Sequence, residues 1–341
     1  MEIWTVRTPE TGTAERQAER AEAAGWDGVA FTDSQNLVGD PFVAAALASR
    51  VTERLRLGTG VTNAATRDPA VLATVAATVQ EASAGRFVLG VGRGDTALFH
   101  LGRKPQPVDD FVERATQLHD YLGGGTVERG GFDSRLRWLD RATQPRVPVD
   151  IAASGPKVIR FAAATMERVT FAVGADPRRV EWALELARDA LSAAGRDERD
   201  VSFGAYVIVG CHPDREVARD LIDASVAAFA HFSSMPGSTG AGLDERDGAV
   251  VAEVGRAYDS NMHLVHHAPH TQALAPDFVD RFAVVGEPDE CVRRLEELAA
   301  LGLSRFVFTG AAFGADRAEA KRATELVVRE VLPALHAATA L

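Results

Sequence analysis

Short apolar runs alternate along the chain with longer amphipathic segments. Gly28-Val29-Ala30-Phe31-Thr32 is apolar on both faces, which is typical of a strand in a parallel sheet that helices cover on both sides. We expect the other strands at 3–6, 55–57, 86–92, 149–153, 168–173, 201–209 and 305–308, and helices at 13–24, 42–51, 70–83, 108–122, 157–164, 176–194, 214–230, 288–301 and 317–335. About eight strand–helix alternations in a chain of this length predict an α/β fold, a (β/α)8 TIM barrel.

Two segments interrupt this alternation. Residues 123–146 contain Gly123-Gly124-Gly125 and Gly130-Gly131 among charged residues, which predicts a loop or a small hairpin. Residues 232–282 are longer, with helical stretches around 250–264, and an insertion of this length is typical of a lid or an interface. We therefore expect a single domain, residues 1–341, with insertions at about 123–146 and 232–282.

Helix starts carry recognisable capping residues. Asp40 and Asp68 each precede a proline and an apolar helix, the usual place of an N-cap followed by proline in the first turn. Thr13 is expected to cap the first helix in the same way. Between the third strand and Asp68 lies Gly58-Thr59-Gly60-Val61-Thr62-Asn63. Because Gly58 and Gly60 have no Cβ, a flat ligand could lie directly on this backbone; a well-packed turn without a ligand is the alternative.

Chemically useful side chains follow several of the predicted strands. Because the carboxyl ends of barrel strands share one mouth, we expect these groups to converge there although they are scattered along the sequence. They are Asp33, Thr59 to Asn63, Arg93-Gly94-Asp95, Ser154-Gly155-Pro156-Lys157 and Gly174-Ala175-Asp176.

Ser154-Gly155-Pro156-Lys157 is a candidate anion site. Gly155 permits close backbone approach, and Pro156 stands at the first position of a helix whose free N–H groups and dipole attract negative charge. Ser154 adds a hydroxyl and Lys157 a cation. An ordinary N-cap explains Ser154 alone. Lys157 is expected to be a charge partner; as a Schiff-base nucleophile, in an aldolase-type barrel, it would need a buried amine.

Net charge and cysteine usage limit the class of partner. The chain has 37 basic and 48 acidic residues, a net charge of −11, which argues against nucleic acid or an anionic membrane. Cys211 and Cys291 are far apart in sequence and lack a metal-binding spacing, as expected in a reducing cytoplasm. We expect a cytoplasmic protein, because neither a leader pattern nor a membrane-length apolar run is present.

Other catalytic motifs are absent or incomplete. Gly90-Val91-Gly92-Arg93-Gly94-Asp95 has the wrong spacing for a dinucleotide fingerprint, and Arg93 and Asp95 either bind a ligand or pair with each other. His263 and His267, four apart, could share a metal, but no acidic third ligand stands at the expected distance. We predict no metal, and a surface or substrate-lining role for these histidines. Without a nucleophile or metal cage, an organic cofactor is expected to carry the chemistry.

The sequence resembles a known family along nearly its whole length. Gly58-Thr59-Gly60-Val61-Thr62-Asn63 with Thr66-Arg67-Asp68-Pro69-Ala70 is similar to the third-strand signature of the luciferase-like flavin-dependent oxidoreductases, nearest to the F420-dependent methylenetetrahydromethanopterin reductases. The segments 85–95, 153–157 and 285–290 follow in the family's order. Two positions depart from that branch, which usually has proline and an aromatic residue at Ala64-Ala65 and histidine at Asp68; both put its substrate in question.

The resemblance implies a fold, a cofactor and site residues. It implies a barrel assembled as a homodimer, with a non-prolyl cis peptide bond between Gly60 and Val61 behind the ring of the cofactor, reduced F420 or FMN. Asp33, the proposed catalytic residue, would face the ring with Thr62 and Asn63; a structural aspartate that caps the following turn is the alternative. The phosphate would be held by Ser154, Gly155, Pro156 and Lys157. Arg93, Gly94 and Gly174 complete the expected cofactor-binding set.

Three functions are consistent with this sequence. The first is an oxidoreductase that passes hydride between reduced F420 and a small organic substrate lying under the insertion. The second is a monooxygenase that uses FMNH2, supplied by a separate reductase, and oxygen. The third is a non-catalytic flavin-binding or ligand-sensing barrel, which would bind cofactor without turnover.

Overall fold

The computed structural model describes residues 1–10, 12–238 and 240–338. Its main sheet has the strand order β10-β9-β11-β1-β2-β3-β4-β7-β8, with β9 also pairing with β8. Eight of these strands, all except β10, close into a ring, and a helix follows each of them, so the predicted (β/α)8 barrel is confirmed. The strands are β1 (Glu2–Arg7), β2 (Gly28–Phe31), β3 (Arg56–Thr59), β4 (Phe87–Val91), β7 (Val149–Ala153), β8 (Arg168–Phe171), β9 (Ser202–Cys211), β10 (Val284–Gly286) and β11 (Arg305–Thr309).

The described residues form two compact units, and each is considered by itself. The N-terminal unit contains Trp4–Ala152 and Thr165–Arg168. The C-terminal unit contains Met1–Ile3, Ala153–Ala164 and the chain from Val169 onward. The single luciferase-like domain expected for residues 1–341 stays a prediction.

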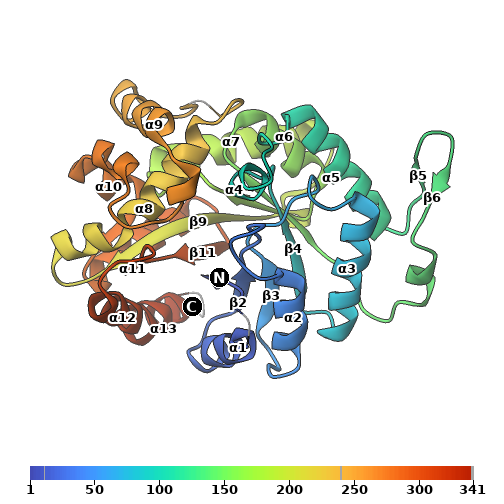
Figure 1. Cartoon of the computed structure of the whole chain (residues 1–341), viewed down its shortest axis with the longest axis horizontal. Coiled ribbons are helices and arrows are strands. Elements are labelled where there is room, and N and C mark those ends of the chain that lie inside the picture. Colours follow the sequence, from blue (N-terminus) through green and yellow to red (C-terminus); the bar gives the residue numbers. More distant parts are fainter. Residues whose placement is uncertain (11, 239, 339–341) are drawn as a thin grey trace. The chain divides into compact units, whose positions relative to one another are not determined.

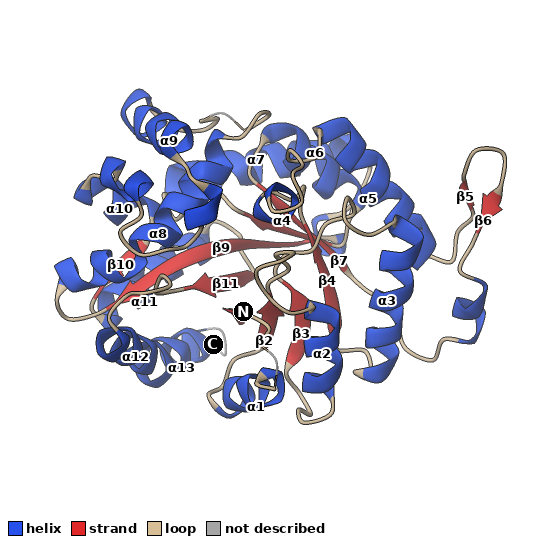
Figure 2. Cartoon of the chain, viewed as in Figure 1, coloured by secondary structure: helices blue, strands red, loops and turns tan. Residues whose placement is uncertain are grey.

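The N-terminal unit is built on β2, β3 and β4, which adjoin one another in parallel (Figure 1). Every residue of β2 and β4 is buried, because helices cover these strands (Figure 2). The hairpin of β5 (Val127–Glu128) and β6 (Asp133–Ser134) confirms the small hairpin expected in 123–146. The helices of this unit are α1 (Ala14–Ala23), α2 (Pro41–Ser49), α3 (Pro69–Ala82), the short α4 (Thr96–Phe99), which the sequence did not predict, and α5 (Val108–Leu122), with the 3-10 turn η1 (Arg137–Arg141) after the hairpin.

Aspartate caps begin two helices as predicted. The Oδ1 atom of Asp40 accepts hydrogen bonds from the amides of Phe42 (2.8 Å) and Val43 (3.1 Å) at the start of α2. Asp68 accepts one from the amide of Ala70 (2.9 Å) at the start of α3. The side-chain cap expected from Thr13 is wrong. Its hydroxyl donates to the carbonyl of Glu10, and its side chain makes no capping hydrogen bond to the first amides of α1.

The C-terminal unit contains the long insertion. β10, a three-residue strand that the sequence did not reveal, pairs in parallel with β9. The predicted final helix is divided by a π turn, η5 (Val327–Val331). The helices of this unit are α6 (Pro156–Thr165), α7 (Pro177–Ala193), α8 (Arg215–Ser234), α9 (Glu245–Ala257), α10 (Pro276–Phe282), α11 (Pro288–Ala300), α12 (Arg317–Leu326) and α13 (Leu332–Ala338), with short 3-10 turns η2 (Glu198–Asp200), η3 (Ser260–Met262) and η4 (Pro269–Ala273).

Two further features bear on the sequence predictions. None of the helices in the described part of the chain combines the length and apolar character needed to cross a bilayer. Cys211 and Cys291, distant in sequence, are both buried and unbridged. Their hydrogen bond, together with burial, raises the pKa of the Cys291 thiol, so this thiol stays protonated and unreactive at neutral pH.

Candidate active site

The turn after β3 has an unusual backbone. The peptide bond between Gly60 and Val61 is cis, the geometry that the family resemblance implies at this position. The turn stays attached to its neighbours, because the amide of Gly60 donates to the carbonyl of Phe31 (2.7 Å) and the amide of Thr62 donates to that of Gly90 (2.9 Å). Thr62 and its backbone are thus fixed between β2 and β4.

The glycines of this turn pack closely against neighbouring strands. A Cβ on Gly58 would lie 2.9 Å from the carbonyl oxygen of Val88, and one on Gly60 would lie 2.8 Å from the Cβ of Ala30. The Cβ directions of both glycines are therefore filled by protein, and the predicted contact of this backbone with a flat ligand stays a prediction. Close packing between strands is the reason for glycine at both positions.

Asp33 is the centre of a buried hydrogen-bond network. Its side chain is 2% exposed and accepts from the hydroxyl of Thr62, from Nη1 of Arg67 and from Nε2 of Gln35, each at 2.6 Å. Arg67 also donates to Asp40 (2.7 Å). Burial by itself would lower the pKa of Arg67, but the two carboxylates outweigh it and raise that pKa, so the cation that faces Asp33 is permanent.

Asn63, Arg93 and Gly94 lie in the same unit and have partners within the protein. Oδ1 of Asn63 accepts from the amides of Ala65 (3.1 Å) and Thr66 (2.8 Å), so this oxygen closes a local turn. Gly94 has a positive φ of 74°, and a Cβ there would lie 3.3 Å from Cγ of Asn63. Arg93 donates through Nε to the carbonyl of Gln106 (2.9 Å), and burial lowers its pKa despite the nearby charge of Asp95.

The Ser154 loop precedes α6 and contacts the long insertion. The hydroxyl of Ser154 lies 2.9 Å from that of Ser238 and donates to the carbonyl of Phe232 (3.3 Å), so it does not cap α6. A Cβ on Gly155 would lie 2.3 Å from the carbonyl oxygen of Gly237. Gly155, directly before the helix, has no side chain with which to cap it, and the exposed Lys157 stands in the first turn.

Gly174 follows β8 in the C-terminal unit. Its φ is +83°, and a Cβ there would lie 2.9 Å from the ring of Phe282. Conformation and packing thus explain this glycine, while the amide of Ala175 donates to the carbonyl of Phe282 (2.8 Å). The predicted contact with a cofactor stays a prediction.

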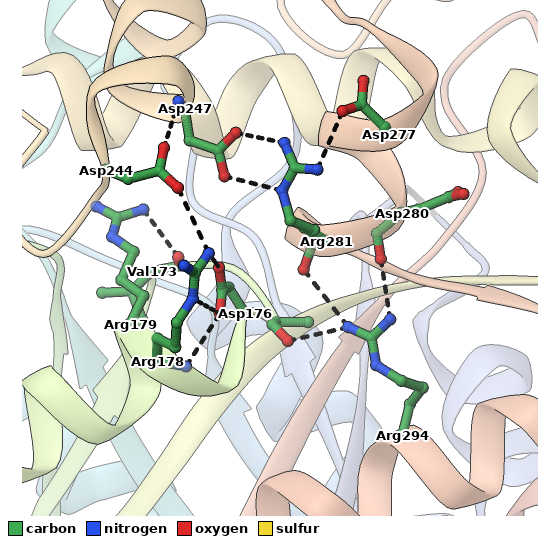
Figure 3. Close-up of polar contacts among 11 residues, drawn as sticks. Val173, Asp176, Arg178, Arg179, Asp244, Asp247, Asp277, Asp280, Arg281 and Arg294 are labelled. Atoms are coloured by element: carbon green, nitrogen blue, oxygen red, sulfur yellow. Dashed lines mark hydrogen bonds and ion pairs between the residues drawn. The ribbon is translucent and has the colours of Figure 1, made fainter.

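Arginine and aspartate side chains connect the segment after β8 to the insertion (Figure 3). Asp247 of α9, which is buried, accepts from Nη2 (2.5 Å) and Nε (3.1 Å) of Arg281 in α10. Nη2 of Arg294 in α11 donates to the carbonyl of Ala175 (3.2 Å), and its Nη1 donates to that of Asp280 (2.9 Å). The bonds of Asp247 join α9 to α10, and the bonds of Arg294 join α11 to α10 and to the segment after β8.

Arg179 is a fully buried cation within this connection (Figure 3). Its Nη1 donates to the carbonyl of Val173 (2.8 Å) and to the hydroxyl of Ser233 (3.0 Å). Among the described residues, Nη2 finds no hydrogen-bond acceptor. Burial lowers the pKa of Arg179 to about 10, which still leaves it charged at neutral pH.

The insertion contributes an aromatic and histidine cluster that the sequence analysis did not identify as one site. The ring of Tyr258 stacks on His231 (centroids 3.9 Å apart) and lies 4.4 Å from His270. Its hydroxyl hydrogen-bonds to Nδ1 of His263. Tyr258, His263 and His270 lie 27 to 39 residues after His231, so no local pattern reveals this cluster, although the aromatic and histidine content of 258–270 was a signal.

The four-residue spacing of His263 and His267, considered in the sequence analysis as a possible metal pair, does not align their rings, because 263–267 is not helical. His263 contacts Tyr258, whereas Nε2 of His267 lies 2.7 Å from Oδ1 of Asp220 in α8. The pair that meets is His266 and His267, whose rings stack with centroids 3.7 Å apart.

The predicted site residues therefore form two groups. In the N-terminal unit, Thr62 hydrogen-bonds to Asp33, and Gly94 lies beside the side chain of Asn63. The Ser154 loop and Gly174 belong to the C-terminal unit. Their convergence on one cofactor stays a prediction.

A (β/α)8 barrel places its functional groups in the turns after its strands, and many classes of enzyme use this scaffold. Residues 4–305 match the family model described as luciferase-like monooxygenase, and the chain belongs to that family.

Similar proteins extend over most of the chain. It is 28% identical over 320 residues to a 5,10-methylenetetrahydromethanopterin reductase of Methanolobus tindarius, covering 92% of this chain and 94% of that protein. It is 30% identical over 278 residues to an F420-dependent glucose-6-phosphate dehydrogenase of Microbacterium testaceum, with coverage of 77% and 74%. Among solved structures, the F420-dependent tetrahydromethanopterin reductase of Methanopyrus kandleri has a TM-score of 0.74 at 23% identity, covering 98% of both chains. That likeness shows the fold.

Proposed function

We propose that this oxidoreductase transfers hydride between the deazaflavin F420 and a small organic substrate. The names of two relatives at 27–30% identity support F420 over FMN, because both are dehydrogenases described as F420-dependent. FMN appears in the titles of structures at 16% identity. The observation that carries the proposal is the start of α6, where the exposed Lys157 flanks a helix N-terminus that follows Gly155.

The residues at this helix fit the phosphate of such a cofactor. The helix N–H groups of the first turn attract an anion, Lys157 adds a positive charge at the surface, and the hydroxyl of Ser154 lies beside them. The buried Arg179 adds positive charge in the same unit. We propose Ser154, Gly155, Pro156 and Lys157 as the phosphate contacts and Gly174 as a further one.

The turn after β3 is proposed to support the ring of the cofactor. Gly60, Val61, Thr62 and Asn63 would line it, with Arg93 and Gly94 at its edge. Because three donors already occupy the carboxylate of Asp33, we propose that Asp33 acts mainly by holding Thr62 and Arg67 in place. Reduced F420, when bound, supplies the hydride; the protein supplies orientation and the exclusion of water.

Tyr258 and His263 are the proposed substrate-side groups. Hydride addition to a carbonyl or imine carbon also requires a proton at the oxygen or nitrogen, and a tyrosine hydroxyl bonded to an imidazole can deliver one. His263 also lies near Phe232 (ring centroids 6.3 Å apart), whose carbonyl bonds to Ser154. Replacing Tyr258 with Phe is expected to lower kcat and remove the basic limb of its pH profile, with KM little changed.

Anaerobic titration with F420H2 and, separately, FMNH2 tests the cofactor. Saturable binding of F420H2 is expected, weakened about tenfold by Lys157→Ala, which removes one phosphate charge. Arg160→Ala, an exposed cation one turn further along α6, is the matched control and should bind like the parent. Preferential binding of FMNH2 with oxygen consumption would instead support the monooxygenase function, and tight F420 binding without reduction of any ketone, aldehyde or imine would support a non-catalytic barrel.

The partners proposed for this reaction follow from its chemistry. A separate enzyme must reduce the cofactor after each turnover, and the substrate is a small organic molecule. A homodimer is proposed from the family resemblance, and sedimentation velocity of the purified chain tests it.

A further inference from the structure

Two histidines and two aspartates in the C-terminal unit form a cluster that the proposed reaction does not use. Asp220 and Asp223 stand one turn apart on α8, and His266 and His267 follow η3. Nε2 of His267 and Nε2 of His266 lie 2.7 Å and 3.4 Å from the carboxylate oxygens of Asp220. One ligand atom from each of these three residues lies within 4.8 Å of the others.

The backbone brings both imidazoles to the same side. Side chains of neighbouring residues in extended chain point to opposite faces, but His267 has a φ of +55°, the left-handed region that non-glycine residues seldom adopt. The segment is fixed before this point, because the amide of His266 donates to the carbonyl of Phe313 (2.9 Å). The amide of His267 donates to Oδ2 of Asp223 (2.9 Å). The rings are therefore held in place by the main chain.

Asp223 orients His266 in the way that metal sites require. Nδ1 of His266 lies 3.1 Å from Oδ1 of Asp223, whose side chain is 14% exposed. A carboxylate that accepts the N–H of one imidazole nitrogen fixes the tautomer and leaves the other nitrogen free to bind a metal, an arrangement that accompanies most histidine ligands. In this cluster the other nitrogen, Nε2, is the atom that faces Asp220.

We propose that Asp220, His266 and His267 bind a divalent transition metal of the zinc type, with Asp223 as the orienting partner. Two imidazoles and one carboxylate select such a metal over Mg²⁺ or Ca²⁺, which prefer oxygen ligands. The two carboxylates also supply negative charge that a dication neutralises. Asp220 and His267 are exposed at 47% and 67%, so water can complete the coordination. The bound metal ties the segment between η3 and η4 to α8.

The test uses the full chain without a polyhistidine tag, stripped with EDTA and dialysed. Calorimetric titration with ZnCl2 is expected to give one ion per chain, and CoCl2 should give the intense visible bands of a tetrahedral or five-coordinate site. Asp220→Asn and His267→Ala should each weaken binding at least tenfold, and Asp223→Asn about tenfold through the misaligned imidazole. His119→Gln is the matched control, because His119 pairs with Glu167 (3.1 Å), outside this cluster, and should bind as the parent does.

Thermal unfolding gives a second readout. Zinc should raise the midpoint of the parent and of His119→Gln, and should leave that of Asp220→Asn unchanged. Absence of saturable binding, a weak octahedral cobalt spectrum, or equal affinity in the parent and Asp220→Asn would each overturn the proposal. The cluster shares no residue with the proposed F420 site and the titrations contain no F420, so this result does not depend on the proposed function.

Discussion

The hydroxyl of Thr62 donates a hydrogen bond of 2.6 Å to Oδ2 of Asp33, which joins the turns after β2 and β3. Both residues are buried, and the same oxygen accepts from Nη1 of Arg67. Two strand ends are thus held by one carboxylate, and the geometry of the Gly60–Asn63 turn depends on its charge.

Asp33→Asn is expected to lower the free energy of unfolding by about 1–3 kcal/mol, because a neutral amide loses the charge that faces Arg67 and turns an NH2 group toward one of the three donors. If the proposed function holds, F420 binding should weaken as well. Chemical denaturation and cofactor titration measure both effects. Asp40→Asn is the control, since Asp40 is 43% exposed and asparagine also caps helices; equal losses in the two variants would contradict the assignment.

Gly155→Ala should disturb the contact between the Ser154 loop and the insertion. Its Cβ would meet the carbonyl oxygen of Gly237 at 2.3 Å and the hydroxyl of Ser238 at 2.8 Å. One of the two segments must shift, at a cost of about 1–3 kcal/mol, and the proposed phosphate contact should weaken with it. Gly248→Ala in α9, where a Cβ has open space, should instead stabilise by up to about 1 kcal/mol. A Gly155→Ala protein as stable as its parent would show that the loops are not in contact.

Asp247→Asn tests the connection between α9 and α10. Asp247 is 3% exposed and accepts two bonds from Arg281, so its neutralisation should cost about 2 kcal/mol. Asp277→Asn is the matched control, because Asp277 binds the same arginine at 3.1 Å but is 43% exposed, and it should cost less than about 1 kcal/mol. Urea denaturation of both variants gives the comparison; a larger loss for Asp277→Asn would refute the ranking.

Protonation of His270 is expected to make the free energy of unfolding depend on pH. Its side chain is fully buried. Burial and the neighbouring His231 lower the pKa of His270, against the opposing charges of Asp259 and Asp223. The folded state therefore favours neutral imidazole, while the unfolded chain takes up a proton near pH 6.5. The free energy of unfolding should fall as the pH drops below about 6.5, with a slope of at most about 1.4 kcal/mol per pH unit from this group.

Denaturation of the parent and of His270→Gln between pH 8 and pH 5 measures this contribution. The parent should lose stability more steeply than the variant below about pH 6.5. Parallel curves over the whole range would show that His270 titrates alike in the folded and unfolded states.

The sequence by itself determined the fold class and most elements, because these depend on local signals. An apolar strand such as β2, and a cap such as Asp40 before a proline, act over a few residues and can be read directly. The Gly60–Val61 geometry was available only through family resemblance. β10 and α4 were missed because three or four residues carry too little periodicity to distinguish them from loop.

Only the tertiary structure decided which distant side chains meet. Gly58 and Gly60 proved to make room for Val88 and Ala30. The side chain of His267 pairs with Asp220, 47 residues earlier in the sequence, rather than with His263. Such contacts depend on how helices and strands pack and on single backbone torsions, and neither produces a periodic pattern in the sequence. Which distant residues are in contact is therefore visible only in the folded chain.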